Sequence, residues 1–287
     1  MAMKVMPLKT RHQATLAWWV VCILLAVLFL LPLYLMVTQA FKSPAEAAAI
    51  PPTLWPHSWS LDSFRRMGGE VASINISQHI LNSLYVSLAT VGAVVLVSTL
   101  GGYSFARLNF PGKGVWFFGL LVTFMIPFQA IITPLYLVMR ALHLQNSLVG
   151  LALVYITYQL PFGLYLMRNA FGTIPREIPE AALLDGCSTL SSLTRVMLPI
   201  ALPGVVTTAL FAFFAAWNDF FAALILVTDQ DRMTLPVTLS ILQSGQFGTI
   251  DWGVLQAGVV VSAIPCVLLF LVLQRYYVSG LLSGALK

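Results

Sequence analysis

Six long apolar segments constrain this chain more than any other feature of its sequence. A helix that crosses a hydrocarbon core of roughly 30 Å needs about 20 apolar residues, because it has to satisfy its backbone hydrogen bonds internally. The segments are 16–37, 80–104, 115–139, 147–167, 200–228 and 252–274. Only the fifth contains a charged residue, Asp219. The pattern therefore predicts an all-α membrane protein with six transmembrane helices.

The composition excludes several other classes of protein. Of the 287 residues, 59% are hydrophobic and 9% are charged, against roughly a quarter charged in a soluble domain. The net charge of +5 comes from basic residues scattered between apolar runs, so a nucleic-acid partner is not expected and membrane lipid is. Cys22, Cys187 and Cys266 lack metal-ligand spacing, so no metal site is expected.

The distribution of basic residues predicts the orientation of the chain. The first apolar run is longer than the core of a signal peptide, so we interpret it as a retained anchor. Of the 15 Lys and Arg residues, the minority that fall on one side of the membrane are Lys42, Arg65, Arg66, Arg140 and Arg232. The positive-inside rule then places both termini in the cytoplasm. This gives a cytoplasmic N-terminus at 1–15, a transmembrane domain at 16–287, a cytoplasmic loop at 168–199 and outer loops at 38–79 and 229–251.

The cytoplasmic loop is expected to form two short helices joined by a turn. Pro179 and Glu180 suit a first helical turn, and Gly186 can adopt the left-handed conformation that ends a helix. Ser188 or Thr189 can cap the second helix, which we expect to stop before Pro199. Ala181 and Ala182 would leave a low-relief face for a partner. An amphipathic helix that merely lies on the membrane is the alternative.

This loop also contains a motif. Glu180-Ala181-Ala182, three residues, Gly186, nine residues and then Val196-Met197-Leu198-Pro199 resembles the Glu-Ala-Ala motif of bacterial ABC-importer permeases, with Val196 where Ile is common. Further stretches resemble the carbohydrate branch of that family, the type of the maltose and glycerol-3-phosphate permeases. They are Tyr103–Arg107 with Phe110–Gly112, Ile126-Pro127, Pro134–Tyr136, Leu160–Phe162, Ala216–Phe220 and Gln274–Leu281.

The resemblance implies a type I ABC importer permease fold in a bacterial inner membrane. It also implies a heterodimer with a second permease, two ATPase subunits and an extracytoplasmic sugar-binding protein. This chain has no Gly-x4-Gly-Lys-Ser/Thr phosphate loop, so it is expected to be non-catalytic and to bind no cofactor, with ATP and Mg in the ATPase partners. The ATPase-coupling residues carried over from the motif are Glu180, Ala181, Ala182, Asp185, Gly186, Leu198 and Pro199.

Polar side chains within the spans are candidates for a translocation pathway, because they are costly in lipid. These candidates are Asn82, Gln129, Tyr155, Tyr158, Gln159, Asn218 and Asp219. The alternative is that they hold helices together. For Asp219 we consider a water-filled cavity, a cap on an internal kink and a partner contact, and we favour a packing or gating role. Pro127, Pro134 and Pro161 interrupt spans three and four, where irregular backbone can line a cavity.

The outer loop at 229–251 has a polar, glycine-containing tip. The resemblance implies that this loop helps to release sugar from the binding protein, with Gln243, Ser244, Gly245, Gln246 and Phe247 as the candidate residues. An ordinary solvated loop is the alternative.

The sequence thus predicts a permease subunit of an ATP-driven, binding-protein-dependent sugar importer. A permease for a glycerophosphodiester or a polyol, or an ion-coupled carrier, remains the alternative. A carrier should contain several buried carboxylates, whereas only Asp219 lies within a span. An intramembrane enzyme is not favoured, because the four histidines fall at or outside the predicted membrane edges.

Overall fold

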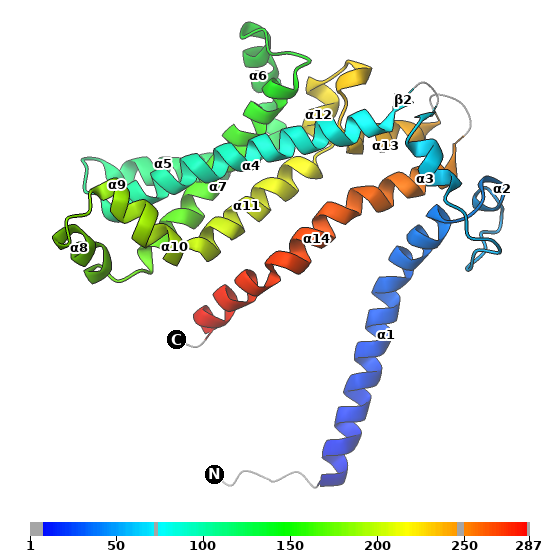
Figure 1. Ribbon diagram of the computed structural model, residues 1–287, viewed down its shortest axis with the longest axis horizontal. Coiled ribbons are helices and arrows are strands. Elements are labelled where there is room, and N and C mark those ends of the chain that lie inside the picture. The colour runs from blue at the N-terminus through cyan, green and yellow to red at the C-terminus, as the bar shows by residue number, and fades with distance from the viewer. Residues whose placement is uncertain (1–7, 72–73, 246–249, 286–287) are drawn as a thin grey trace. The chain divides into compact units, whose positions relative to one another are not determined.

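The computed structural model of the chain describes residues 8–71, 74–245 and 250–285, mostly as helices (Figure 1). The chain divides into two compact units. The first comprises the described residues up to Gly69 together with Leu242–Val261, and the second comprises Glu70–Ile241 together with the described residues from Ser262. The first unit contains α1 (Leu8–Ala40), α2 (Pro44–Ala47) and α3 (Asp62–Met67).

The second unit opens with a short antiparallel pair, β1 (Glu70–Val71) and β2 (Ile74–Asn75), in which Val71 pairs with Ile74. The elements that follow are α4 (Ile76–Arg107), α5 (Lys113–Phe124), α6 (Phe128–Ala141), α7 (Leu148–Gly172), α8 (Glu177–Leu184), α9 (Thr189–Ser191), the π-helical η1 (Ser192–Met197), α10 (Leu198–Ile200), α11 (Leu202–Trp217), α12 (Phe221–Leu226), the 3₁₀-helical η2 (Gln230–Arg232), α13 (Leu235–Ser244) and α14 (Trp252–Ala285). The last two helices each contribute residues to both units.

Four helical segments in the described part of the chain are long and apolar enough to cross a membrane: Trp18–Ala40, Ile76–Arg107, Leu148–Gly172 and Trp252–Gln274. Two bent pairs also qualify: Lys113–Phe124 with Phe128–Ala141, bent by 100°, and Thr189–Ile200 with Leu202–Trp217, bent by 79°. If each pair is one span, the number reaches the six expected from the sequence.

Two of the expected spans are broken. The third bends where Met125–Pro127 separate α5 from α6, at a proline that lacks a backbone N–H and so suits the start of a helix. Pro134 and Pro161, in contrast, lie inside continuous helices. The fifth segment, expected as one stretch over 200–228, ends at Trp217 and restarts at Phe221.

The core of the second unit is a group of three helices. In it α4 packs most extensively against α7, and α11 runs beside both (Figure 1). The contact between α4 and α7 is close because Gly102 faces backbone: a Cβ there would lie 2.5 Å from the Cβ of Met167 and 2.8 Å from the amide nitrogen of Arg168. At the far end of α11, the Trp217 indole is buried and donates to the carbonyl of Ser262 at 2.9 Å, which joins α11 to α14.

In the first unit, the segment after α1 is folded around a buried lysine. The Lys42 Nζ donates to the carbonyl of Thr53 at 2.5 Å. The Glu46 carboxylate accepts from the Thr53 hydroxyl at 2.9 Å and from the His57 amide at 3.0 Å. An Arg66–Asp251 ion pair joins α3 to the residue before α14. Residues 42–57 of the predicted outer loop are therefore joined by their own hydrogen bonds.

Candidate functional site

The segment between α7 and α11 forms two helical stretches joined by a tight turn, as the sequence predicts. Gly186 has a φ of +84°, and the amide of Cys187 donates to the carbonyl of Ala182 at 3.0 Å, which is the pattern of a left-handed helix stop. The Ser188 hydroxyl then accepts from the amide of Ser191 at 3.2 Å. The turn between the two stretches is thus fixed by a glycine and a helix cap, which makes the projection rigid.

The expectation that the second stretch stops before Pro199 is wrong. Helical structure continues from α9 through η1 into α10, which contains Pro199 and ends at Ile200. In η1 the amide of Leu198 donates to the carbonyl of Leu193, five residues back. A proline ring clashes with the carbonyl four residues earlier in an α-helix, and the wider π turn moves that carbonyl away.

The face that this segment offers to a partner also differs from the expectation. Ala181 is exposed, but Ala182 is buried within the chain, because the turn at Gly186 folds back over it and α8 packs against η1. Instead, two leucines project: Leu184 is 89% exposed and Leu183 is 49% exposed. The Glu-Ala-Ala motif does not by itself predict this leucine surface.

Among the other residues assigned to coupling, Glu180, Asp185 and Pro199 are exposed and Leu198 is half-buried. Leu198 packs against the apolar cluster formed by Met167, Phe171 and neighbouring residues. The segment therefore has an apolar side joined to the spans and an open side that carries charged and leucine side chains.

The break in the fifth span is organised by Asp219. Its Oδ2 accepts from the Tyr155 hydroxyl at 2.6 Å and from the amides of Ala222 and Ala223 at 3.0 and 3.1 Å. The carboxylate therefore satisfies backbone donors at the start of α12 and joins that helix to α7. Among the roles that the sequence suggested for Asp219, this geometry matches a cap on an internal kink.

The remaining pathway candidates near the two breaks lie on or close to the surface of the chain. Gln129 and Asn218 are exposed, and the Asn218 amide donates to the carbonyl of Phe214 at 3.0 Å. Tyr158 and Gln159 are half-buried, and the Tyr158 ring contacts Phe128 in a T-shaped pair at 4.9 Å. The structure thus brings polar side chains of α6, α7 and the 218–220 break to the outside of this chain.

Asn82 is separated from these candidates and holds other elements together. Its buried amide nitrogen donates to the carbonyls of Asp231 and Met233, both at 2.9 Å. Nearby, the Ser83 hydroxyl accepts from the amide of Leu235, and the Thr238 hydroxyl lies 2.6 Å from Nδ1 of the buried His79. The geometry of Asn82 therefore fits the alternative role, in which a polar side chain holds helices together.

The same polar cluster fixes the segment that leads to the candidate binding-protein loop. The expected loop over 229–251 is partly helical, because α13 extends through Ser244. Gln243 and Ser244 are exposed at its end, and Gly245 follows with a φ of +68°. Gln246 and Phe247 lie outside the described residues. The tip thus follows a helix that is itself hydrogen-bonded to α4.

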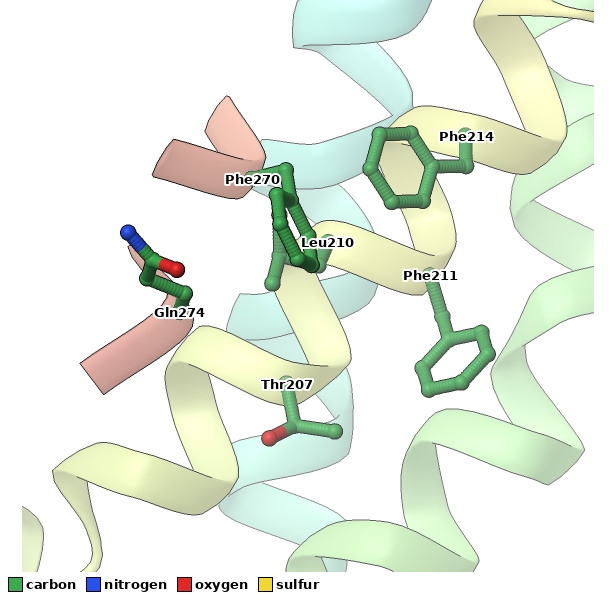
Figure 2. A pocket seen from close by; sticks show the side chains of 6 residues that line it. All are labelled: Thr207, Leu210, Phe211, Phe214, Phe270 and Gln274. Carbon is green, nitrogen blue, oxygen red and sulfur yellow. The ribbon is translucent and has the colours of Figure 1, made fainter. Parts of the chain in front are cut away.

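The second unit contains a cavity of about 230 Å³ that the sequence does not predict. Figure 2 shows side chains that line it. The residues lining it, from α11 and α14, are Thr207, Leu210, Phe211, Phe214, Phe270 and Gln274. Its two polar side chains donate locally, Thr207 to the carbonyl of Pro203 and Gln274 to that of Leu271. The lining is therefore apolar, and its chemistry does not suit a solute rich in hydroxyl groups.

Apolar spans that are interrupted near exposed polar side chains define a class of protein: a multi-span membrane transport protein. Residues 76–282 match the family described as "Binding-protein-dependent transport system inner membrane component". The chain belongs to this family, which confirms the resemblance noted in the sequence.

Several curated relatives are similar over nearly their full length. "Probable ABC transporter permease protein YurM" of Bacillus subtilis is 35% identical, over 94% of this chain and 87% of the relative. "Diacetylchitobiose uptake system permease protein DasC" of Streptomyces coelicolor is 31% identical, over 93% and 95% of the two chains. "Trehalose transport system permease protein SugB" of Mycobacterium tuberculosis is 34% identical, over 92% of each.

A solved structure shares the fold. It belongs to a bacterial ABC transporter involved in the import of the acidic polysaccharide alginate. The TM-score is 0.81 with 22% sequence identity, and the similarity covers 96% of this chain and 100% of that chain. The similarity confirms the expected fold class.

Proposed function

We propose that this chain is one permease subunit of an ATP-driven, binding-protein-dependent sugar importer and that it contributes half of the translocation pathway. The observation that carries the proposal is the pair of exposed breaks in otherwise apolar spans. Met125, at the first break, is 80% exposed, and Asn218, at the second, is exposed. Irregular backbone at membrane depth is tolerated only against protein or a water-filled cavity.

A second permease provides the cover that these breaks need. Because Gln129, Asn218 and part of Tyr158 face outward, a partner that closes over them would enclose amide and phenol groups in one cavity. Such groups bind sugar hydroxyls and stack against sugar rings. Two such surfaces, one from each permease, would form the polar passage.

The projecting segment over residues 168–199 is the proposed docking site for an ATPase. The exposed side chains of Leu183 and Leu184 are the proposed apolar contact with the ATPase. This chain is then non-catalytic and binds no cofactor, and ATP and Mg belong to the ATPase partners. The charge distribution supports an orientation with this segment and both termini in the cytoplasm.

The class of solute is inferred from the relatives, several of which are named for diacetylchitobiose and trehalose uptake. A polyol or a glycerophosphodiester would fit the same polar groups, whereas an ion-coupled carrier would not need an ATPase docking segment. The extracytoplasmic binding protein selects the solute before it reaches the permeases, and the tip at Gln243–Gly245 is the proposed contact.

The test is reconstitution of the purified importer, with its binding protein, in vesicles. We expect uptake of a radiolabelled di- or oligosaccharide that depends on ATP and on the binding protein and is insensitive to collapse of ion gradients. The solute retained by the purified binding protein identifies the class. Uptake without ATP, or abolished by an ionophore, would contradict the proposal in favour of a carrier.

A further inference from the structure

A second cavity, of about 310 Å³, lies where the C-terminal end of α4, the start of α5 and the start of α8 meet. It is polar, unlike the cavity between α11 and α14. Arg107 from α4, Lys113 from α5 and Arg176 before α8 line it, together with a single carboxylate, that of Glu180. The cavity therefore has three cationic groups and one anionic group.

These cations are not neutralised within the described part of the chain. None of the ion pairs formed there involves Arg107, Lys113 or Arg176. Moreover, Arg176 lies close enough to Arg107 for the two guanidinium groups to repel each other. The three cations outnumber the single carboxylate of Glu180, so the cavity has a net positive charge that favours the binding of an anion.

Two of the three cationic groups are also held in place. The Arg107 Nη2 donates to the carbonyls of Phe171 and Ile174 at the end of α7, while its Nε is buried with no acceptor. The Lys113 Nζ donates to the carbonyl of Leu108 at 2.9 Å. A guanidinium fixed in this way loses little conformational entropy when it binds an anion.

The start of α5 adds a further source of positive potential. This 12-residue helix begins after Gly112, which has a φ of +75° and provides no side-chain cap. The amide of Lys113 donates to the carbonyl of Phe110 at 3.4 Å, and the other N–H groups of the first turn attract anions, phosphate above all. The potential of the helix end thus adds to that of Lys113, its first residue.

We propose that this cavity binds a phosphate group, carried by an anionic lipid headgroup or by free inorganic phosphate. Arginine and lysine pair with phosphate oxygens through short, charge-assisted hydrogen bonds, and the volume admits a phosphate with a glycerol-sized substituent. The cavity lies at the ends of two membrane helices, the level at which basic pockets meet anionic headgroups.

An anion bound in this cavity would also contact the projecting segment, because Glu180 and Leu183 of α8 line the same cavity. A bound phosphate would neutralise the repulsion around Arg176 and hold α8 against the ends of α4 and α5. Only this consequence for transport rests on the proposed function, whereas the binding of phosphate does not.

The binding test uses the purified full-length chain in detergent, mixed with equal amounts of phosphatidylglycerol and phosphatidylcholine and examined by native mass spectrometry. Arg176→Gln removes an exposed cation, and Lys113→Gln removes a cation whose Nζ also donates to the carbonyl of Leu108, directly after α4. Arg195→Gln is the matched control, since Arg195 is an exposed cation in the same segment but does not line the cavity. Arg107 is left intact because it caps α7.

We expect the wild-type chain and Arg195→Gln to retain phosphatidylglycerol in preference to phosphatidylcholine. Each cavity variant should lose about tenfold in that retention, as expected for one charge-assisted contact. Millimolar inorganic phosphate, compared with chloride at equal ionic strength, separates the two sources. Displacement of the lipid indicates that free phosphate binds, and persistence indicates a lipid site.

Equal retention of both lipids by the wild-type chain, with no binding of inorganic phosphate, would overturn the proposal. So would an equal loss in Arg195→Gln and in the two cavity variants, because it would show a general charge effect. If one cavity variant does not fold, the other gives the same comparison. A change in transport without a change in lipid retention would concern the proposed function alone.

Discussion

The Tyr155 hydroxyl donates a 2.6 Å hydrogen bond to Oδ2 of Asp219, across 64 residues of sequence. The same oxygen accepts from two backbone amides at the start of α12. One carboxylate oxygen thus serves as a helix cap and as a connection between α7 and the broken fifth span. An acidic residue within a span is costly, and here three donors offset that cost.

The first prediction concerns this carboxylate. Asp219→Ala removes the acceptor of three donors and leaves a buried hydroxyl unpaired, so we expect a loss of about 2–4 kcal/mol in stability. Asp219→Asn keeps an oxygen acceptor but loses the charge and should cost about 1 kcal/mol. Thermal unfolding of the purified chain in detergent measures both.

Tyr155→Phe provides the matched control, because it removes one donor and leaves both amide contacts of the cap. It should resemble Asp219→Asn rather than Asp219→Ala. If all three variants unfold at the wild-type temperature, the carboxylate does not stabilise the break.

Sequence patterns predicted four of the six expected spans as continuous helices, because apolar length is a property of a segment's own residues. Apolar length predicted the helices, and Gly186 and Ser188 predicted the turn and the cap through local conformation and hydrogen bonding. In contrast, the burial of Ala182 depends on a chain reversal onto η1, and the role of Asn82 depends on carbonyls about 150 residues away. Such pairings between distant segments are not encoded in any local pattern.

The second prediction concerns the close contact of α4 with α7. Gly102→Ala places a Cβ against the backbone of Arg168, so the helices must separate and stability should fall by about 1–3 kcal/mol. Gly92→Ala, in the same helix, meets nothing within 4 Å and should gain about 0.5–1 kcal/mol. Thermal unfolding in detergent compares the two, and equal effects would contradict the close contact.

The third prediction is a loss of order at acid pH in the segment between α1 and α3. The backbone N–H of His57, and next the Thr53 hydroxyl, lower the pKa of Glu46 below its ordinary value of 4.5, although desolvation opposes them. A carboxyl group with a lowered pKa in the folded state stabilises that state above its unfolded pKa. The contribution is lost as the pH falls through the lower, folded pKa.

Hydrogen exchange of the amides in residues 53–59, corrected for the intrinsic pH dependence, measures this effect. Protection should be constant above about pH 5 and should fall below the ordinary carboxyl range. Glu46→Gln should show weaker protection with no such transition. If the same transition persists unchanged in Glu46→Gln, another titrating group causes it.

The last prediction concerns the projecting segment over residues 168–199, where the exposure of each side chain decides which variant isolates a partner contact. Ala182→Trp disturbs the chain's own packing, because Ala182 is buried, so it does not isolate a partner contact. Leu184→Ser isolates such a contact, because Leu184 is 89% exposed. Burying a leucine contributes about 1.5–3 kcal/mol, so ATPase docking should weaken roughly ten- to a hundredfold. Leu54→Ser, an exposed leucine of the first unit, is the control.

Gly186 tests the geometry of the same segment. A Cβ at Gly186 meets nothing within 4 Å, so a substitution is strained only by the φ of +84°. Gly186→Val should therefore cost about 1–2 kcal/mol and weaken docking, whereas Gly186→Asn, which tolerates the left-handed conformation, should retain it. Pull-down of the ATPase with the tagged chain measures docking. If Leu184→Ser and Gly186→Val both retain the ATPase at the wild-type level, this segment is not the docking site.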